Sequence, residues 1–142
     1  MIKDNEVLFI YNSNDMQERR ALGYAKSLKN HKLKEKDLYK ENLSETQIKE
    51  IANKIGEHPI SLINKNSDLY KEEYNGLNYD EEDILKLIKN NPLIMKTPIA
   101  VYHDRASFVE SSFEFIKMDM VSHSFKDELS NKDESGTDKT KI

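Results

Sequence analysis

The chain has 142 residues, a length that fits one domain with its own hydrophobic core. Its 26 acidic residues outnumber its 22 basic ones, so a positive field over the whole molecule does not drive nucleic-acid binding. The chain has no cysteine, which excludes disulfides, thiolate metal sites and cysteine nucleophiles. No stretch approaches the ~20 apolar residues of a membrane span. The first residues also lack a signal-peptide pattern, and we expect a cytoplasmic protein with no membrane partner.

The N-terminal region predicts the first half of a β-α-β unit. An apolar run from Val7 to Tyr11 is typical of a buried strand. Turn and capping residues follow, and apolar residues three and four apart predict a helix from Asp15 to Lys29. We expect the charged segment from His31 to Tyr39 to form a strand parallel to the first.

The middle of the chain predicts helices. Ser44 and Gln47 form a capping box before an apolar stripe, and Gly56 stands where that helix should end. Pro59 is suited to the first turn of another short helix. A polar connection is expected from Tyr70 to Tyr79.

The pattern then changes from helices to a hairpin. Asp80 is suited to cap a helix that ends before Pro92. Ile99 to Tyr102 reads as a strand, and a turn and a second short strand, Ser107 to Val109, should pair back on it.

The last part of the chain is different in composition. A capping box at Ser111 predicts a final helix, and few large apolar residues follow Ser122. We therefore expect a domain over residues 1–121 and a disordered polar tail over residues 122–142. The order of elements predicts an α/β, thioredoxin-like (glutaredoxin-type) mixed sheet with an inserted helical segment, and Pro98 stands where a cis proline fits.

Four segments, at matching spacings, carry a resemblance to a known family. They are Ile10-Tyr11-Asn12, Arg20-Ala21-Leu22, Leu62-Ile63-Asn64-Lys65 with Tyr70-Lys71, and the run from Asn91 to Val101. With these segments the sequence resembles the glutaredoxin-fold arsenate reductases and the related Spx regulators. The resemblance implies their fold over most of the chain, from Glu6 to Met118.

The family's chemistry requires residues that this chain lacks. The catalytic cysteine of the family falls on Met16, and its three oxyanion-binding arginines fall on Asn64, Thr97 and Glu110. A thioether cannot ionise, and two neutral groups and a carboxylate cannot replace three guanidinium groups. The Cys-x-x-Cys pair of the Spx regulators falls on residues 16–19, Met-Gln-Glu-Arg, so thiol sensing is lost too. We expect no catalytic residue, no enzyme activity and no cofactor.

Some residues of this region remain candidates for binding. The amides around Asn14, before the first helix, are suited to bind a small anion or a peptide backbone, or serve only as a cap. Arg20 either faces the same pocket or is a solvated charge paired with Glu18 or Glu41.

Met16, Thr97 and Pro98 complete the candidate binding residues. Met16 is suited to fill the cysteine's place as an apolar plug, or to act as an oxidation switch. Thr97 and Pro98 either present backbone groups to an extended peptide or form a structural turn. The histidines His31, His58, His103 and His123 are scattered over different predicted elements, and we expect no metal site.

These observations leave two hypotheses for function. The first is an inactive arsenate-reductase-like protein that binds a protein partner and has a regulatory role. The Spx resemblance implies a transcription-related partner, because those regulators contact RNA polymerase. The alternative is a binder of a small molecule, glutathione or an oxyanion, or an enzyme that uses the same pocket without a cysteine.

Overall fold

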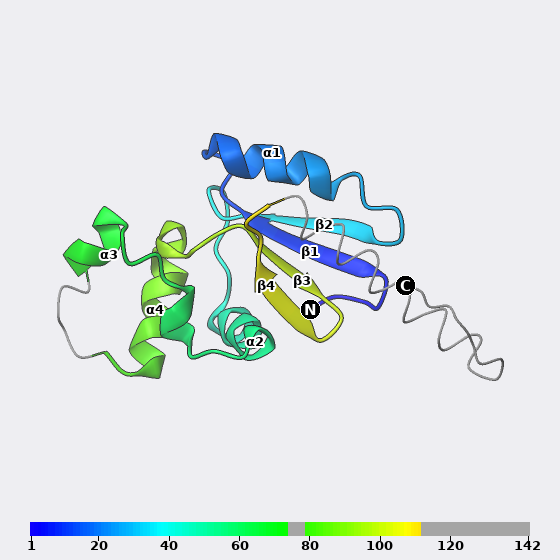
Figure 1. Cartoon of the computed structure of the whole chain (residues 1–142). Helices are drawn as coiled ribbons and strands as arrows, with labels where there is room; N and C mark the ends of the chain where they lie inside the picture. Colours follow the sequence, from blue (N-terminus) through cyan, green and yellow to red (C-terminus); the bar gives the residue numbers. More distant parts are fainter. Residues whose placement is uncertain (74–78, 112–142) are drawn as a thin grey trace.

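The fold is built on a four-stranded mixed sheet with the order β2-β1-β3-β4 (Figure 1). The computed structural model describes residues 1–73 and 79–111. Strand β1 pairs in parallel with β2 and antiparallel with β3, and β3 and β4 form a hairpin. The strands are β1 (Glu6–Tyr11), β2 (Lys32–Asp37), β3 (Ile99–Tyr102) and β4 (Arg105–Phe108).

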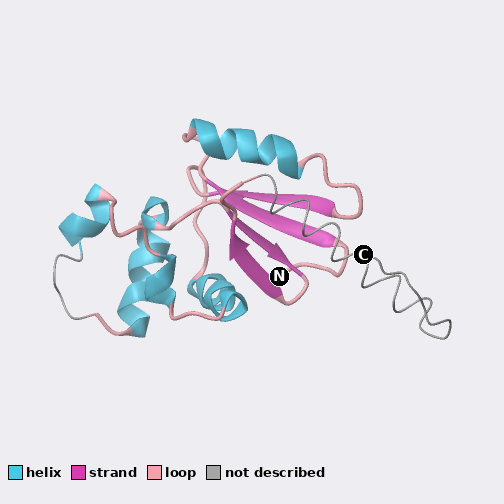
Figure 2. Cartoon of the chain, in the orientation of Figure 1, coloured by secondary structure: helices cyan, strands magenta, loops and turns pink. Residues whose placement is uncertain are grey.

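Helices lie on both sides of this sheet (Figure 2). Helix α1 covers one face, and α2 and α4 lie on the other. The helices are α1 (Met16–Ala25), α2 (Glu45–Ile55), α3 (Asp68–Glu73) and α4 (Glu81–Asn90), with short 3-10 helices η1 (Pro59–Leu62) and η2 (Pro92–Ile94).

The alternation of side chains along β1 divides the core into two clusters. Val7, Phe9 and Tyr11 point to the α1 side, where they pack with Ala25. Ile10 points to the opposite side, into the larger cluster formed mainly by α2, α4 and the 3-10 helices. A continuous apolar run therefore serves both faces of one central strand, as the sequence predicted.

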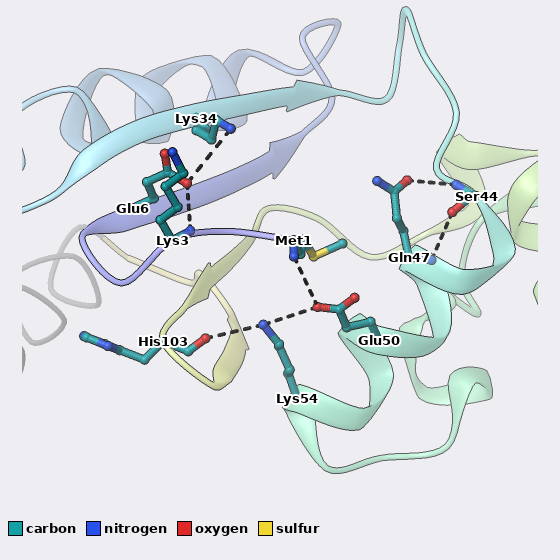
Figure 3. A network of polar contacts seen from close by, with 9 residues as sticks. All are labelled: Met1, Lys3, Glu6, Lys34, Ser44, Gln47, Glu50, Lys54 and His103. Atoms are coloured by element: carbon teal, nitrogen blue, oxygen red, sulfur yellow. Dashed lines mark hydrogen bonds and ion pairs between the residues drawn. The ribbon is translucent and has the colours of Figure 1, made fainter.

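The local signals around α2 are confirmed. The Ser44 hydroxyl accepts the Gln47 amide and the Gln47 side chain accepts the Ser44 amide, at 3.1 and 3.0 Å. Gly56 ends the helix with a φ of 89°, a left-handed conformation that favours glycine. Figure 3 shows this box, and beside it Glu50 of α2 between the N-terminal ammonium group and Lys54.

Two helical predictions need correction. Helix α1 ends at Ala25 and not at Lys29, because the amide and hydroxyl of Ser27 both donate to the Tyr24 carbonyl and close the last turn. Part of the expected polar connection is helical, because the Ser67 hydroxyl accepts the Tyr70 amide and starts α3.

The remaining strand predictions hold, with one shifted boundary. The segment after His31 forms β2 parallel to β1, and its position at the sheet edge explains how a strand can be so charged. Strand β4 begins at Arg105, before the expected Ser107, because the turn is tight and His103 adopts a positive φ of 53°.

The Thr97–Pro98 peptide bond is cis, as predicted. The helix expected after Ser111, the boundary between residues 121 and 122 and the tail over 122–142 lie outside the described residues. Within the described ranges, no helix combines the length and the apolar character needed to cross a membrane.

Candidate functional site

The candidate site lies where β1 ends and α1 begins. The loop of residues 12–15 joins the two elements, and Asp15 caps the helix by accepting the Glu18 amide at 3.1 Å. The Thr97 hydroxyl donates to the Glu18 carboxylate, and this bond connects the segment of Thr97 and Pro98 to the start of α1.

Glu18 is the central side chain of the site. Only 9% of this residue is exposed. Its carboxylate accepts the Asn12 amide at 2.8 Å and the Thr97 hydroxyl at 2.9 Å, so it joins the loop to a segment far away in the sequence. Burial raises the pKa of Glu18, and the charge of Asp15 adds to this effect against the two hydrogen bonds.

Asp37 holds the same loop from the end of β2. Its carboxylate accepts the amides of Ser13 and Tyr39, each at 3.0 Å. Burial disfavours the charged form of Asp37, but hydrogen bonds from Ser13 and Tyr39 and the charge of Lys40 outweigh it, so the pKa is lowered.

The other donors of the loop are also paired within the chain. The Asn14 amide donates to the Asn12 side chain at 2.9 Å, and the Asp15 amide donates to the Asn12 carbonyl at 3.1 Å. The amides of residues 12 to 15 therefore all have internal acceptors. An anion could use them only by displacing these groups, two of which are carboxylates.

The predicted binding residues of α1 and its loop are on the surface. Asn14 and Arg20 are exposed, and in the described part of the chain no ion pair joins Arg20 to Glu18 or Glu41. The neighbouring Arg19 reaches back to the loop, with its guanidinium group 2.7 Å from the Ser13 carbonyl.

The prediction that Met16 fills the cysteine's place as an apolar plug is wrong. It is the first residue of α1 and is 58% exposed, so it does not fill a buried space. Thr97 and Pro98 are half-buried, and the Pro98 carbonyl accepts the Val109 amide at 2.9 Å. The structure thus brings Thr97, but not Met16, into contact with the buried acid.

Sequence reasoning missed both buried acids. Asp15 and Glu18 have the spacing of a capping box, which could have drawn attention to the pair. Glu18 departs from that motif, because its side chain accepts the amide of Asn12 and not that of Asp15. Asp37 carried no comparable signal beyond its place at the end of a predicted strand.

The positions that correspond to the family's arginines do not supply positive charge. Asn64 and Glu110 are exposed, and Thr97 donates its hydroxyl to Glu18. Two of the scattered histidines do meet, since the rings of His31 and His103 lie 5.9 Å apart, edge to face. Among residues 1–73 and 79–111, no group of three or more histidines, cysteines or acids is placed to hold a metal ion.

Comparison with solved structures identifies the fold. An arsenate reductase from Vibrio cholerae matches with a TM-score of 0.71 at 14% identity, over 81% of this chain and 98% of that one. A provisionally assigned arsenate reductase from Yersinia pestis matches with a TM-score of 0.68 at 19% identity, over 79% and 99%. An arsenate reductase related protein from Brucella melitensis matches with a TM-score of 0.57 at 13% identity, over 82% and 97%.

This chain has the thioredoxin-like fold of arsenate reductase structures. The predicted fold class is confirmed, although at such low identity the likeness concerns the fold alone. No protein-family model matches the sequence, and no curated protein does. Within this arsenate-reductase-like fold the chain has no cysteine, and the end of β1 is held by Glu18 and Asp37.

Proposed function

We propose that this arsenate-reductase-like chain has no reductase activity and acts by binding a protein partner, with a regulatory role. The observation that carries the proposal is the buried carboxylate of Glu18. It accepts the Asn12 amide and the Thr97 hydroxyl at the start of the first helix.

The residues at this place support the proposed lack of reductase chemistry. Arsenate reduction of the family's kind starts with a thiolate, and the chain has no cysteine. An oxyanion also needs free donors and positive charge. Here the loop amides are paired with internal acceptors, and Glu18 and Asp37 would repel an anion.

An exposed surface lies beside this loop and supports the proposal of a partner. Met16 is 58% exposed and Tyr39 is 54% exposed, and both flank the loop that Asp37 holds through the amides of Ser13 and Tyr39. Exposed aromatic and methionine side chains are common at protein interfaces. The resemblance to the Spx regulators favours a partner from the transcription machinery, bound through Asn14, Met16, Arg20, Thr97 and Pro98.

Two experiments test the two parts of the proposal. The first is an assay of arsenite formation from arsenate with a thiol donor, together with amide NMR titrations against phosphate, arsenate and glutathione. We expect no turnover and a flat titration. Saturable shifts confined to residues 12–20 and 97–100 would instead support the alternative, a small-molecule binder.

The second experiment tests the partner surface in cells. A photo-crosslinking amino acid replaces Met16 in one variant and exposed Lys86 of α4 in a matched control. We expect Met16 to give one dominant crosslinked protein that the Lys86 position does not give. Equal crosslinking at the two positions would show that this surface is not the binding site.

A further inference from the structure

Strand β2 lies in a segment whose charge is opposite to that of the whole molecule. Residues 26–40 contain six lysines and only two acids, Glu35 and Asp37, whereas the whole chain carries a net charge of −4. Within β2, Lys32, Lys34 and Lys36 occupy alternate positions. Three of the six lysines therefore lie on β2 and the other three lie on either side of it.

The register places the three lysines on one face of the sheet. Lys32 lies beside Glu6, Lys34 beside Leu8 and Lys36 beside Ile10. The two acids of the segment point to the opposite face.

Both acids accept hydrogen bonds on that face. Glu35 accepts the Tyr11 hydroxyl at 3.2 Å, and Asp37 accepts the Ser13 amide. They consequently do not neutralise the lysines across the sheet.

Few acids face the lysines on their own side. The Lys34 ammonium lies 3.9 Å from the Glu6 carboxylate, and Lys36 lies 3.2 Å from Glu41. Lys32 forms no ion pair with the described residues. Figure 3 shows Lys34 and Lys3 on either side of Glu6.

The pKa of Glu6 reflects the positive charge of this surface. The amide of Lys3 donates to its carboxylate, and the charges of Lys34, Lys3 and Lys32 act with that bond, against burial, to lower the pKa of Glu6. Glu6 and Glu41 thus face four lysines, and the surface keeps an excess of positive charge.

Strand β2 is also an edge strand with backbone groups directed outward. The amides of Lys32 and Leu38 donate to the Asn5 and Tyr11 carbonyls, each at 2.7 Å, on the β1 side. Because backbone direction alternates along a strand, the amides and carbonyls of Leu33 and Glu35 point away from β1. No strand among the described residues pairs with this outer side.

We propose that the outer edge of β2 binds an extended acidic segment of a partner protein, which adds to the sheet as a further strand. The outward groups of Leu33 and Glu35 supply the backbone pairing. Acidic side chains at alternate positions of the added strand would lie beside Lys32, Lys34 and Lys36, and such cross-strand pairs are stabilising. A basic or uncharged strand lacks this match, and edge lysines discourage its pairing.

An added strand would use more of the groups on this surface than a nucleic acid would. A phosphate backbone would use the lysines but leave the outward amides of Leu33 and Glu35 unused. The proposed edge is separate from the loop of residues 12–15, and the inference stands whether or not that loop binds a partner.

The direct test is amide hydrogen exchange of the full chain with an added peptide. The probe is a short peptide in which glutamate and valine alternate, and its control has lysine in place of glutamate. We expect the acidic peptide to slow exchange at Leu33 and Glu35 but to leave Lys34 and Lys36, which already face β1, unchanged. Equal binding of both peptides, or binding without this alternating protection, would overturn the proposal.

Two variants separate charge from backbone pairing. K32E/K34E should weaken binding of the acidic peptide by about tenfold or more, because attractive cross-strand pairs become repulsive. The matched control K86E/K89E makes the same charge change on α4 and should bind as the parent chain does. Parent-like binding by K32E/K34E would contradict the proposal.

Glu35→Pro removes one outward amide and keeps every lysine, and proline is tolerated at such an edge position. It also removes the Glu35 carboxylate, a loss of negative charge that by itself would favour the acidic peptide, and the bond from the Tyr11 hydroxyl. We expect it to lose most of the binding. If Glu35→Pro does not fold, the exchange pattern of the parent chain and K32E/K34E decide the question. The contrary result is a single-stranded oligonucleotide that competes with the peptide and leaves Leu33 and Glu35 unprotected. That result would contradict the proposal and indicate that this surface binds a nucleic acid.

Discussion

Glu18 and Asp37 are two acids that hold one loop, and their pKa values shift in opposite directions although burial acts on both in the same way. Each is 9% exposed, and each accepts a loop amide. Yet the pKa of Glu18 is raised and the pKa of Asp37 is lowered.

The difference lies in what surrounds each charge. Asp37 accepts two backbone amides and has Lys40 nearby, whereas Glu18 accepts one amide and one hydroxyl and has the negative Asp15 nearby. An equal exposed fraction therefore does not fix the charge state of an acid. The kind of donors and the sign of the nearest charge contribute to the difference.

The largest effect should come from Asp37→Ala. The substitution leaves the amides of Ser13 and Tyr39 without an acceptor, and we expect it to lower the free energy of unfolding by about 2–3 kcal/mol at neutral pH. Urea unfolding followed by circular dichroism measures this. Asp104→Ala, at an exposed turn, is the control, and an equal loss in both variants would contradict the role of Asp37.

Glu18→Ala should cost less, about 1–2 kcal/mol, although it also leaves two donors unpaired. The reason is that the buried charge of Glu18 is itself unfavourable, as its raised pKa indicates. Exposed Gln17→Ala is the matched control in the same helix. A larger loss for Glu18→Ala than for Asp37→Ala would mean that the kind of donor and the neighbouring charge do not rank the two acids.

The two acids should also give opposite pH dependences. Because the pKa of Glu18 is raised in the folded state, its contribution to stability is fully present below the ordinary value of 4.5 and is lost as pH rises through the folded value. Because the pKa of Asp37 is lowered, its contribution is present above the ordinary value of 3.8 and is lost as pH falls through the folded value.

These pH dependences are measured by comparing the parent chain with Glu18→Gln and with Asp37→Asn. The free energy of unfolding of each is followed from pH 3 to pH 7 (about the range of ordinary carboxyl titration). The difference in free energy of unfolding between the parent chain and Glu18→Gln should become less favourable to the parent chain as pH rises. The corresponding difference for Asp37→Asn should become more favourable to the parent chain. Two slopes of the same sign would refute the comparison.

The range over which residues act explains what the sequence could predict. The capping box of Ser44 and Gln47 and the apolar run of β1 are local patterns, and the structure has both. The bond between Glu18 and Thr97 spans 79 positions, and the bond between Ser13 and Asp37 spans 24. No local pattern encodes such pairs, so the residues that hold the site appeared only with the fold.

A smaller effect is expected when charge is changed on the exposed lysines of β2. K32E/K34E should change the unfolding free energy by about 0.5 kcal/mol or less, because the pair of Lys34 with Glu6 is partly exposed and surface pairs contribute little. The measurement is urea unfolding beside K86E/K89E. A loss as large as that of Asp37→Ala would show that the lysine face stabilises the fold itself, and that a binding role is not needed to explain it.

The smallest expected effect is that of Met16→Cys, which should leave arsenate reduction undetectable. A cysteine at the start of a helix ordinarily gains thiolate character from the helix dipole and from nearby cations. Here Asp15 caps that helix end, Glu18 and Asp37 pair with the loop amides, and the Arg19 guanidinium donates to the Ser13 carbonyl, so the three carboxylates around position 16 oppose a thiolate or an oxyanion.

The introduced thiol should therefore titrate no lower than the ordinary value of about 8.5, which the pH dependence of its alkylation rate measures. Gln17→Cys, one position further along α1, is the control for an exposed helical thiol. A strongly lowered pKa at position 16 together with arsenite formation would mean that the loop amides can turn to a new anion. In that case the two acids would not exclude an anion from the loop, and the loss of the cysteine alone would account for the proposed lack of reductase activity.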